Sequence, residues 1–90
     1  MVVMMLERVS PSLRGELTRW LIEPKTGVFV GRVSAMVRDR LWERVCDGMK
    51  GGAGMIVYPA SNEQGYAIRM CGETKRLAED FEGLTLIRIP

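Results

Sequence analysis

Few side chains in this 90-residue chain could do chemistry, because it has no histidine and only two cysteines. The missing imidazole excludes Ser-His and Cys-His catalysis, histidine acid-base chemistry and most zinc enzymes. Cys46 and Cys71 lack Cys-x-x-Cys spacing, so we expect small core residues rather than a zinc or redox site. Carboxylates and arginines remain as candidates for function.

Glu7 is the acidic residue that we single out, because it directly follows the apolar run of residues 2–6. The end of a buried strand, next to a loop, is a usual position for a working residue. Two copies of Glu7 that meet across a two-fold axis could bind Mg²⁺ together with water. The alternative is structural: Glu7 ends the buried strand or pairs with an arginine.

Arginine is the dominant base, since Lys25, Lys50 and Lys75 are the only lysines among 13 basic residues. Its planar fork binds phosphate through two hydrogen bonds, although a solvated arginine-rich surface is an equal alternative at a net charge of +2. Arg14 lies near a predicted helix start, where free N–H groups attract anions. The other candidates are Arg38, which could instead pair with its helical neighbours, and Lys75-Arg76, which could be a solvated pair.

Hydrophobic patterns indicate the elements that would position these residues. Residues 2–6 read as a buried strand, and Ser10-Pro11 as the start of a helix that runs to about residue 23. Ser34 can cap a second helix that ends before the glycines of 51–54. The expected core faces are Leu13, Leu17, Trp20 and Leu21 in the first helix, and Val37, Leu41, Trp42, Val45 and Met49 in the second, with Arg38 on the exposed side.

The remaining apolar runs predict strands at residues 27–31, 55–58, 66–71 and 84–89, with a turn at 61–65. This order favours one ferredoxin-like domain over residues 1–90, an α/β (α+β) sandwich. Two helices would cover one face of a mainly antiparallel sheet of four to five strands with an extra C-terminal strand. A second copy could pack on the bare face, and the terminal strand could cross to its sheet. No apolar run is long enough to cross a membrane, and no signal peptide is recognisable, so we expect a cytoplasmic protein.

Three sequence blocks occur in a fixed order: Leu-Arg-Gly at 13–15, Trp-Leu-Ile-Glu at 20–23 and Gly-Val-Phe-Val-Gly at 27–31. With Asn-Glu-Gln-Gly-Tyr at 62–66 and Asp-Phe-Glu-Gly-Leu at 80–84, they make the chain resemble the type I-E branch of the CRISPR-associated Cas-two family. The resemblance implies a ferredoxin-like homodimer between two dimers of a catalytic integrase. That assembly captures duplex DNA fragments, the spacer precursors, and inserts them into a CRISPR array.

The resemblance also implies roles for individual residues. Arg14 and Lys75-Arg76 match phosphate contacts of the family. Residues 84–90, with Leu84, Leu86, Ile87 and Ile89, match the segment that docks the integrase. Ser12 stands where the family has a basic residue, and Glu7 where the wider family, often described as a metal-dependent endonuclease, has aspartate.

We therefore expect a DNA-binding scaffold and ruler for spacer acquisition in antiviral defence. Arg14, Arg38, Lys75 and Arg76 would contact phosphates without reading bases, and no cofactor would be required. The alternative is a Mg²⁺-dependent endonuclease acting on RNA or DNA through paired Glu7. A ferredoxin-like RNA-binding module is a third hypothesis, but only Tyr58 and Tyr66 could stack on bases.

Overall fold

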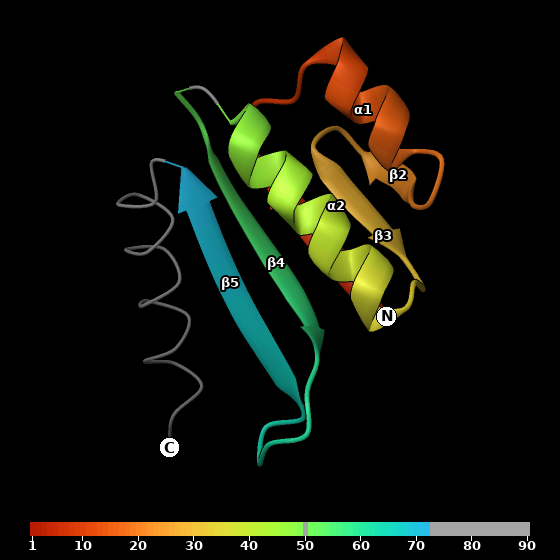
Figure 1. The fold of residues 1–90 in the computed structure, drawn as a ribbon, viewed down its shortest axis with the longest axis vertical. Coiled ribbons are helices and arrows are strands. Elements are labelled where there is room, and N and C mark those ends of the chain that lie inside the picture. Colours follow the sequence, from red (N-terminus) through yellow and green to blue (C-terminus); the bar gives the residue numbers. More distant parts are fainter. Residues whose placement is uncertain (50, 73–90) are drawn as a thin grey trace.

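The computed structural model of the chain describes residues 1–49 and 51–72. Five antiparallel strands form one sheet in the order β2-β3-β1-β4-β5. The elements in chain order are β1 (Val2–Leu6), α1 (Pro11–Leu17), β2 (Ile22–Lys25), β3 (Val28–Gly31), α2 (Ala35–Gly48), β4 (Ala53–Pro59) and β5 (Tyr66–Gly72). Both helices lie on one face of the sheet (Figure 1), so the predicted ferredoxin-like arrangement is confirmed.

Side-chain oxygens at both helix starts explain why the helices begin where the sequence predicts. The Ser10 hydroxyl accepts a hydrogen bond from the Leu13 N–H at 3.1 Å, and Pro11 follows as the first helical residue. Ser34 does the same for α2, accepting from the Val37 N–H at 3.2 Å. Each hydroxyl satisfies an N–H group that has no partner within its helix.

The first helix is shorter than expected. It ends at Leu17, where the Thr18 hydroxyl donates to the carbonyls of Arg14 and Gly15. A turn follows, and the edge strand β2 begins at Ile22, where the sequence predicted helix. Pro24 fits there, because an edge strand does not need every N–H for its ladder.

The core lies between the helices and the covered face of the sheet. Met4, Leu17 and Phe29 are fully buried there. Trp42 is buried as predicted, but Trp20 is 54% exposed, because it follows the early end of α1 and lies in the turn before β2. Met36, in the first turn of α2, is 67% exposed.

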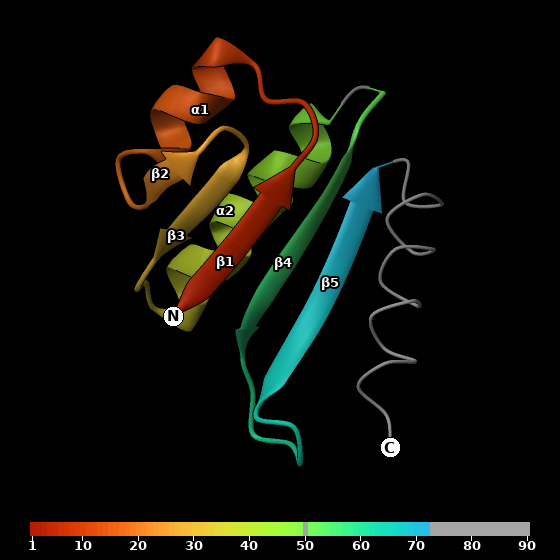
Figure 2. The ribbon, with the colours of Figure 1, turned by 180° about the vertical axis from the view of Figure 1, so that it is seen from behind.

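Neither helix of the described residues lies over the opposite face of the sheet (Figure 2). The register places Val3 beside Val30 and Val57, and Met5 beside Val28 and Met55, on this open sheet face. Ile68 and Met70 continue it onto β5, next to Val57 and Met55. The residues that β1, β3, β4 and β5 direct to this face carry no charge.

Candidate nucleic-acid interface

Arg14 is held by a carboxylate of the neighbouring strand. Its Nε lies 3.1 Å and 3.2 Å from the two carboxylate oxygens of Glu23 in β2. One of these oxygens also accepts the Gly27 N–H at 2.9 Å. The Arg14 side chain is 39% exposed. Because the ion pair uses Nε, the terminal nitrogens can still donate to a phosphate.

Gly27 makes this arrangement possible through its backbone conformation. Its φ is +82°, and a Cβ at this position would lie 2.5 Å from the carbonyl oxygen of Leu6. The same close approach lets the Leu6 N–H donate to the Gly27 carbonyl at 2.8 Å. Only glycine combines this φ with this contact, and the turn directs the Gly27 N–H to Glu23.

The sequence pattern placed Arg38 on the exposed side of α2. In the structure it lies on the inner side of the helix instead. It precedes Leu41, Trp42 and Val45 at helical spacing, so it extends the stripe that faces the sheet. Its guanidinium carbon lies 4.0 Å from the centre of the Tyr58 ring in β4, and its Nε lies 3.0 Å from Asp39 Oδ1. Only 16% of the Arg38 side chain is exposed, so its position is well defined.

Arg69 joins this group from β5, and the sequence analysis did not identify it. Its guanidinium carbon lies 5.2 Å from the same Tyr58 ring, and its Nη1 lies 3.5 Å from Asp39 Oδ1. The hairpin register pairs Tyr58 with Ala67 and Ile56 with Arg69, so both side chains lie on the helix-covered face. The sequence predicts the turn at residues 61–65, and this turn fixes the register. The turn could therefore have been used to place Arg69 on the same face of the sheet as Tyr58.

Glu7 makes contacts that fit its structural interpretation, as the residue that ends the buried strand. Its N–H donates to the Ala53 carbonyl at 2.9 Å, and its carboxylate accepts the Ala53 N–H at 3.1 Å. These reciprocal bonds tie the end of β1 to the start of β4. The described residues contain no group of three His, Cys, Asp or Glu side chains that could bind a metal.

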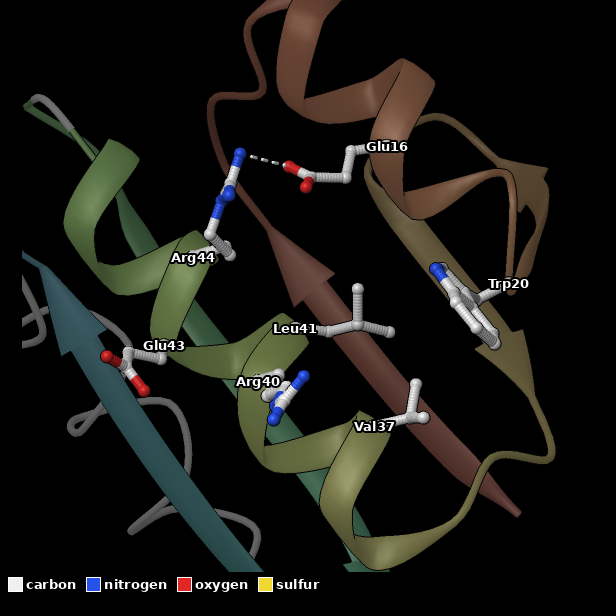
Figure 3. Close-up of a pocket in the computed structure, with 7 residues that line it drawn as sticks. All are labelled: Glu16, Trp20, Val37, Arg40, Leu41, Glu43 and Arg44. Atoms are coloured by element: carbon white, nitrogen blue, oxygen red, sulfur yellow. Dashed lines mark ion pairs between the residues drawn. The ribbon is translucent and has the colours of Figure 1, made fainter.

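A groove of about 490 Å³ lies between α1 and α2 (Figure 3). Trp20, Val37 and Leu41 supply its apolar lining. Arg44 points across it and pairs with Glu16 at 2.9 Å, as the dashed line in Figure 3 shows. The charged lining balances, since Arg40 and Glu43 complete it. A balanced lining gives phosphate no net attraction, so we place no DNA contact here.

The two cysteines are free thiols that pack against the core, in α2 and β5. Burial, together with a hydrogen bond to Cys46, raises the pKa of the Cys71 thiol to about 12. A high pKa keeps a thiol protonated and unreactive, since the thiolate is the nucleophile. Their predicted role as core residues fits this environment.

Comparison with protein families gives a match over nearly the whole chain. The family model described as CRISPR-associated protein (Cas_Cas2CT1978) matches residues 1–86. The chain belongs to this CRISPR-associated family. The match includes Arg14, Glu23 and Gly27, the three residues that form one network between α1 and the β2–β3 turn.

Several expectations for this CRISPR-associated protein concern residues that the structure does not describe. Lys75 and Arg76, the second phosphate-binding pair, lie outside the described residues, and so do Leu84, Leu86, Ile87 and Ile89 of the docking segment. These roles stay predictions. Within the described part of the chain, neither helix has the length and apolar character to cross a membrane.

Proposed function

We propose that this chain is a non-catalytic DNA-binding scaffold and ruler in the complex that acquires CRISPR spacers. It acts as a homodimer, together with a catalytic integrase subunit, on duplex DNA. The family membership supports a role in CRISPR defence. The observation that carries the proposal is the difference between the two faces of the sheet: one is apolar and open, and the other bears helices and arginines.

The open sheet face supports the dimer. Met5 is 36% exposed and Ile22 is 68% exposed, while Val3, Val57 and Ile68 between or beside them are only partly buried. An apolar surface that spans several strands, with Lys25 of β2 at its edge, is typical of an interaction site. A second copy presents the same surface, so two copies related by a two-fold axis would cover each other.

The helix side supports contact with DNA phosphates. Arg14 lies in α1 and Arg38 in the first turn of α2, so two different helices carry them. Both helices lie on the same face of the sheet (Figure 1). Both arginines are anchored by carboxylates and keep further N–H donors. Arginines fixed at separate points can follow a phosphate backbone, and such contacts bind duplexes of any sequence.

The test is fluorescence anisotropy of a labelled duplex of about 30 base pairs over a series of salt concentrations. The protein is measured alone and with its integrase partner. We expect the pair to bind more tightly than either protein alone. Arg14→Ala should reduce the slope of log K against log salt by roughly 0.9 for each phosphate that the variant no longer neutralises.

Glu23→Gln is the matched control, because it breaks the same ion pair and leaves Arg14 in place. It should retain the salt slope, whereas Arg14→Ala should lower affinity for all sequences alike. A change of sequence preference in Arg14→Ala would contradict the proposal. If the partner does not tighten binding, the assignment to the integrase complex is wrong.

A further inference from the structure

The arginine pair around Tyr58 is a candidate anion site that lies apart from Arg14. Arg38 comes from α2, Tyr58 from β4 and Arg69 from β5, so three separate elements position it. Both guanidinium groups lie within reach of one aromatic ring, at 4.0 Å and 5.2 Å from its centre. The ring attracts both cations, which offsets part of their mutual repulsion.

Asp39 forms an ion pair with each of these two arginines. A single oxygen, Oδ1, lies 3.0 Å from Arg38 Nε and 3.5 Å from Arg69 Nη1. Two guanidinium groups against one carboxylate leave the cluster with an excess positive charge. The Asp39 side chain is 49% exposed and that of Arg69 is 46% exposed, so solvent reaches the contact.

The contacts that hold the cluster differ in strength. The Arg69 to Asp39 distance of 3.5 Å is long for a hydrogen bond, and exposed ion pairs contribute little to stability. Arg38 has a second support besides Asp39, since it is only 16% exposed and packs on Tyr58. Asp39 can therefore rotate into solvent while Arg38 stays in place.

We propose that Arg38 and Arg69, arranged around Tyr58, form a phosphate-binding site in which Asp39 is a displaceable internal carboxylate. A phosphate group offers several anionic oxygens, so it can accept from both guanidinium groups where Asp39 now offers one oxygen. The inference extends the proposed DNA-binding function and rests on it for the source of the phosphate. It adds Arg69 as a contact residue and makes Asp39 a built-in competitor that weakens binding.

The first experiment compares Asp39→Asn with Asp47→Asn. Both remove one negative charge from α2, but Asp47 has no ion pair with an arginine among the described residues. We expect Asp39→Asn to bind the 30-base-pair duplex several-fold more tightly than wild type, and Asp47→Asn to change affinity much less. Equal effects of the two variants, or weaker binding by Asp39→Asn, would overturn the proposal.

Removal of each arginine tests the site from the other side. Arg69→Ala should cancel most of the gain when it is added to Asp39→Asn, and it should lower the salt slope. Tyr58→Phe should retain affinity, because the ring is kept. Tyr58→Leu should lose affinity, because Arg38 loses its support. Full retention of the gain in the Asp39→Asn, Arg69→Ala double variant would also count against the proposal.

Inorganic phosphate separates this inference from the proposed function. Arginine Nε–Hε signals in ¹⁵N-edited NMR should include an Arg38 signal, assigned with Arg38→Lys, that shifts on addition of phosphate. The shift should saturate at lower phosphate in Asp39→Asn than in Asp47→Asn. If phosphate shifts this signal but no duplex binds, the anion site stands and the DNA-binding function fails. If a duplex binds and Arg38 responds to neither ligand, the inference fails alone.

Discussion

The two faces of the sheet are built from the same kinds of side chain but have different surroundings. On the covered face Met4 and Phe29 are fully buried beneath the helices, whereas on the open face the adjacent Met5 is 36% exposed. The run Val-Val-Met-Met-Leu of β1 is continuously apolar, as expected of a strand covered on both faces. Within residues 1–49 and 51–72, helices cover only one of these faces, which fits the dimer proposed above.

The largest expected effect concerns the covered face. Phe29→Ala removes a fully buried ring from the core and should lower the free energy of unfolding by about 3–5 kcal/mol. Urea denaturation followed by circular dichroism measures the loss. Trp20→Ala is the matched control, because Trp20 is a large aromatic residue at 54% exposure, and it should cost less than about 1 kcal/mol. Equal costs would mean that the two sites are equally buried.

The next effect concerns the open sheet face. Val57→Lys places a charge beside Val3 and Ile68, in the middle of the surface that the dimer would bury. Burial of an unpaired ammonium group is costly, so the dissociation constant of the dimer should rise by about 100-fold or more. Sedimentation equilibrium measures the change. Met36→Lys adds the same charge on α2 and should leave the dimer intact, so equal dissociation by both variants would rule out this face as the interface.

The smallest expected effect is on the pH dependence of stability, and it comes from Cys71 on the covered face of the sheet. The pKa of Cys71 is raised from 9.0 to about 12, chiefly by burial. Below pH 9 the Cys71 thiol is protonated in both the folded and the unfolded chain, so its titration does not change the free energy of unfolding. Between pH 9 and 12 only the unfolded chain ionises, so stability is lost as pH rises through this range.

Iodoacetamide at pH 8 gives the direct measurement for Cys71, followed by mass spectrometry of a Cys46→Ser variant. We expect alkylation to be at least about tenfold slower in the folded protein than in urea, because only the thiolate reacts. A Cys71→Ser variant should lose less stability between pH 9 and 12 than wild type. Equal alkylation rates in native buffer and in urea would show that Cys71 is accessible and ionises normally.

Local signals predicted most of the fold. The second helix begins after Ser34 as expected, because its cap and its apolar spacing agree. The hairpin between β4 and β5 also follows its turn residues: Asn62 accepts the Gly65 N–H at 2.8 Å and donates to the Tyr66 carbonyl at 2.9 Å. Where propensity, capping and pattern favour the same structure, sequence reasoning succeeds.

The failures occur where tertiary contacts decide. The apolar spacing of Leu13, Leu17 and Leu21 continues past the end of α1, and Leu21 is buried from the turn rather than from the helix. The pattern therefore concealed both the edge strand β2 and the exposure of Trp20. A helical wheel assigns a charged residue to the outside, but Arg38 is tolerated on the inner side because Tyr58 and Asp39 receive its guanidinium.

The candidate site was predictable only in part for the same reason. Arg14 could be selected from its position near a helix start, but its partner Glu23 lies on a strand that the sequence did not reveal. Arg69 meets Arg38 at Asp39, 30 positions away in the sequence, through the packing of α2 on the hairpin. An arrangement of this kind requires the relative placement of three elements, which no local pattern contains.

The edge strand β2 has a consequence for how copies of this chain could assemble. It is four residues long, its register is irregular between Ile22 and Lys25, and Pro24 has no N–H to offer. Such an edge resists the addition of a foreign strand. The sheet can therefore grow through hydrogen bonding on one side at most. Copies that paired edge to edge through the other side of the sheet would form a closed pair, because β2 would offer no second edge for a fibre to continue.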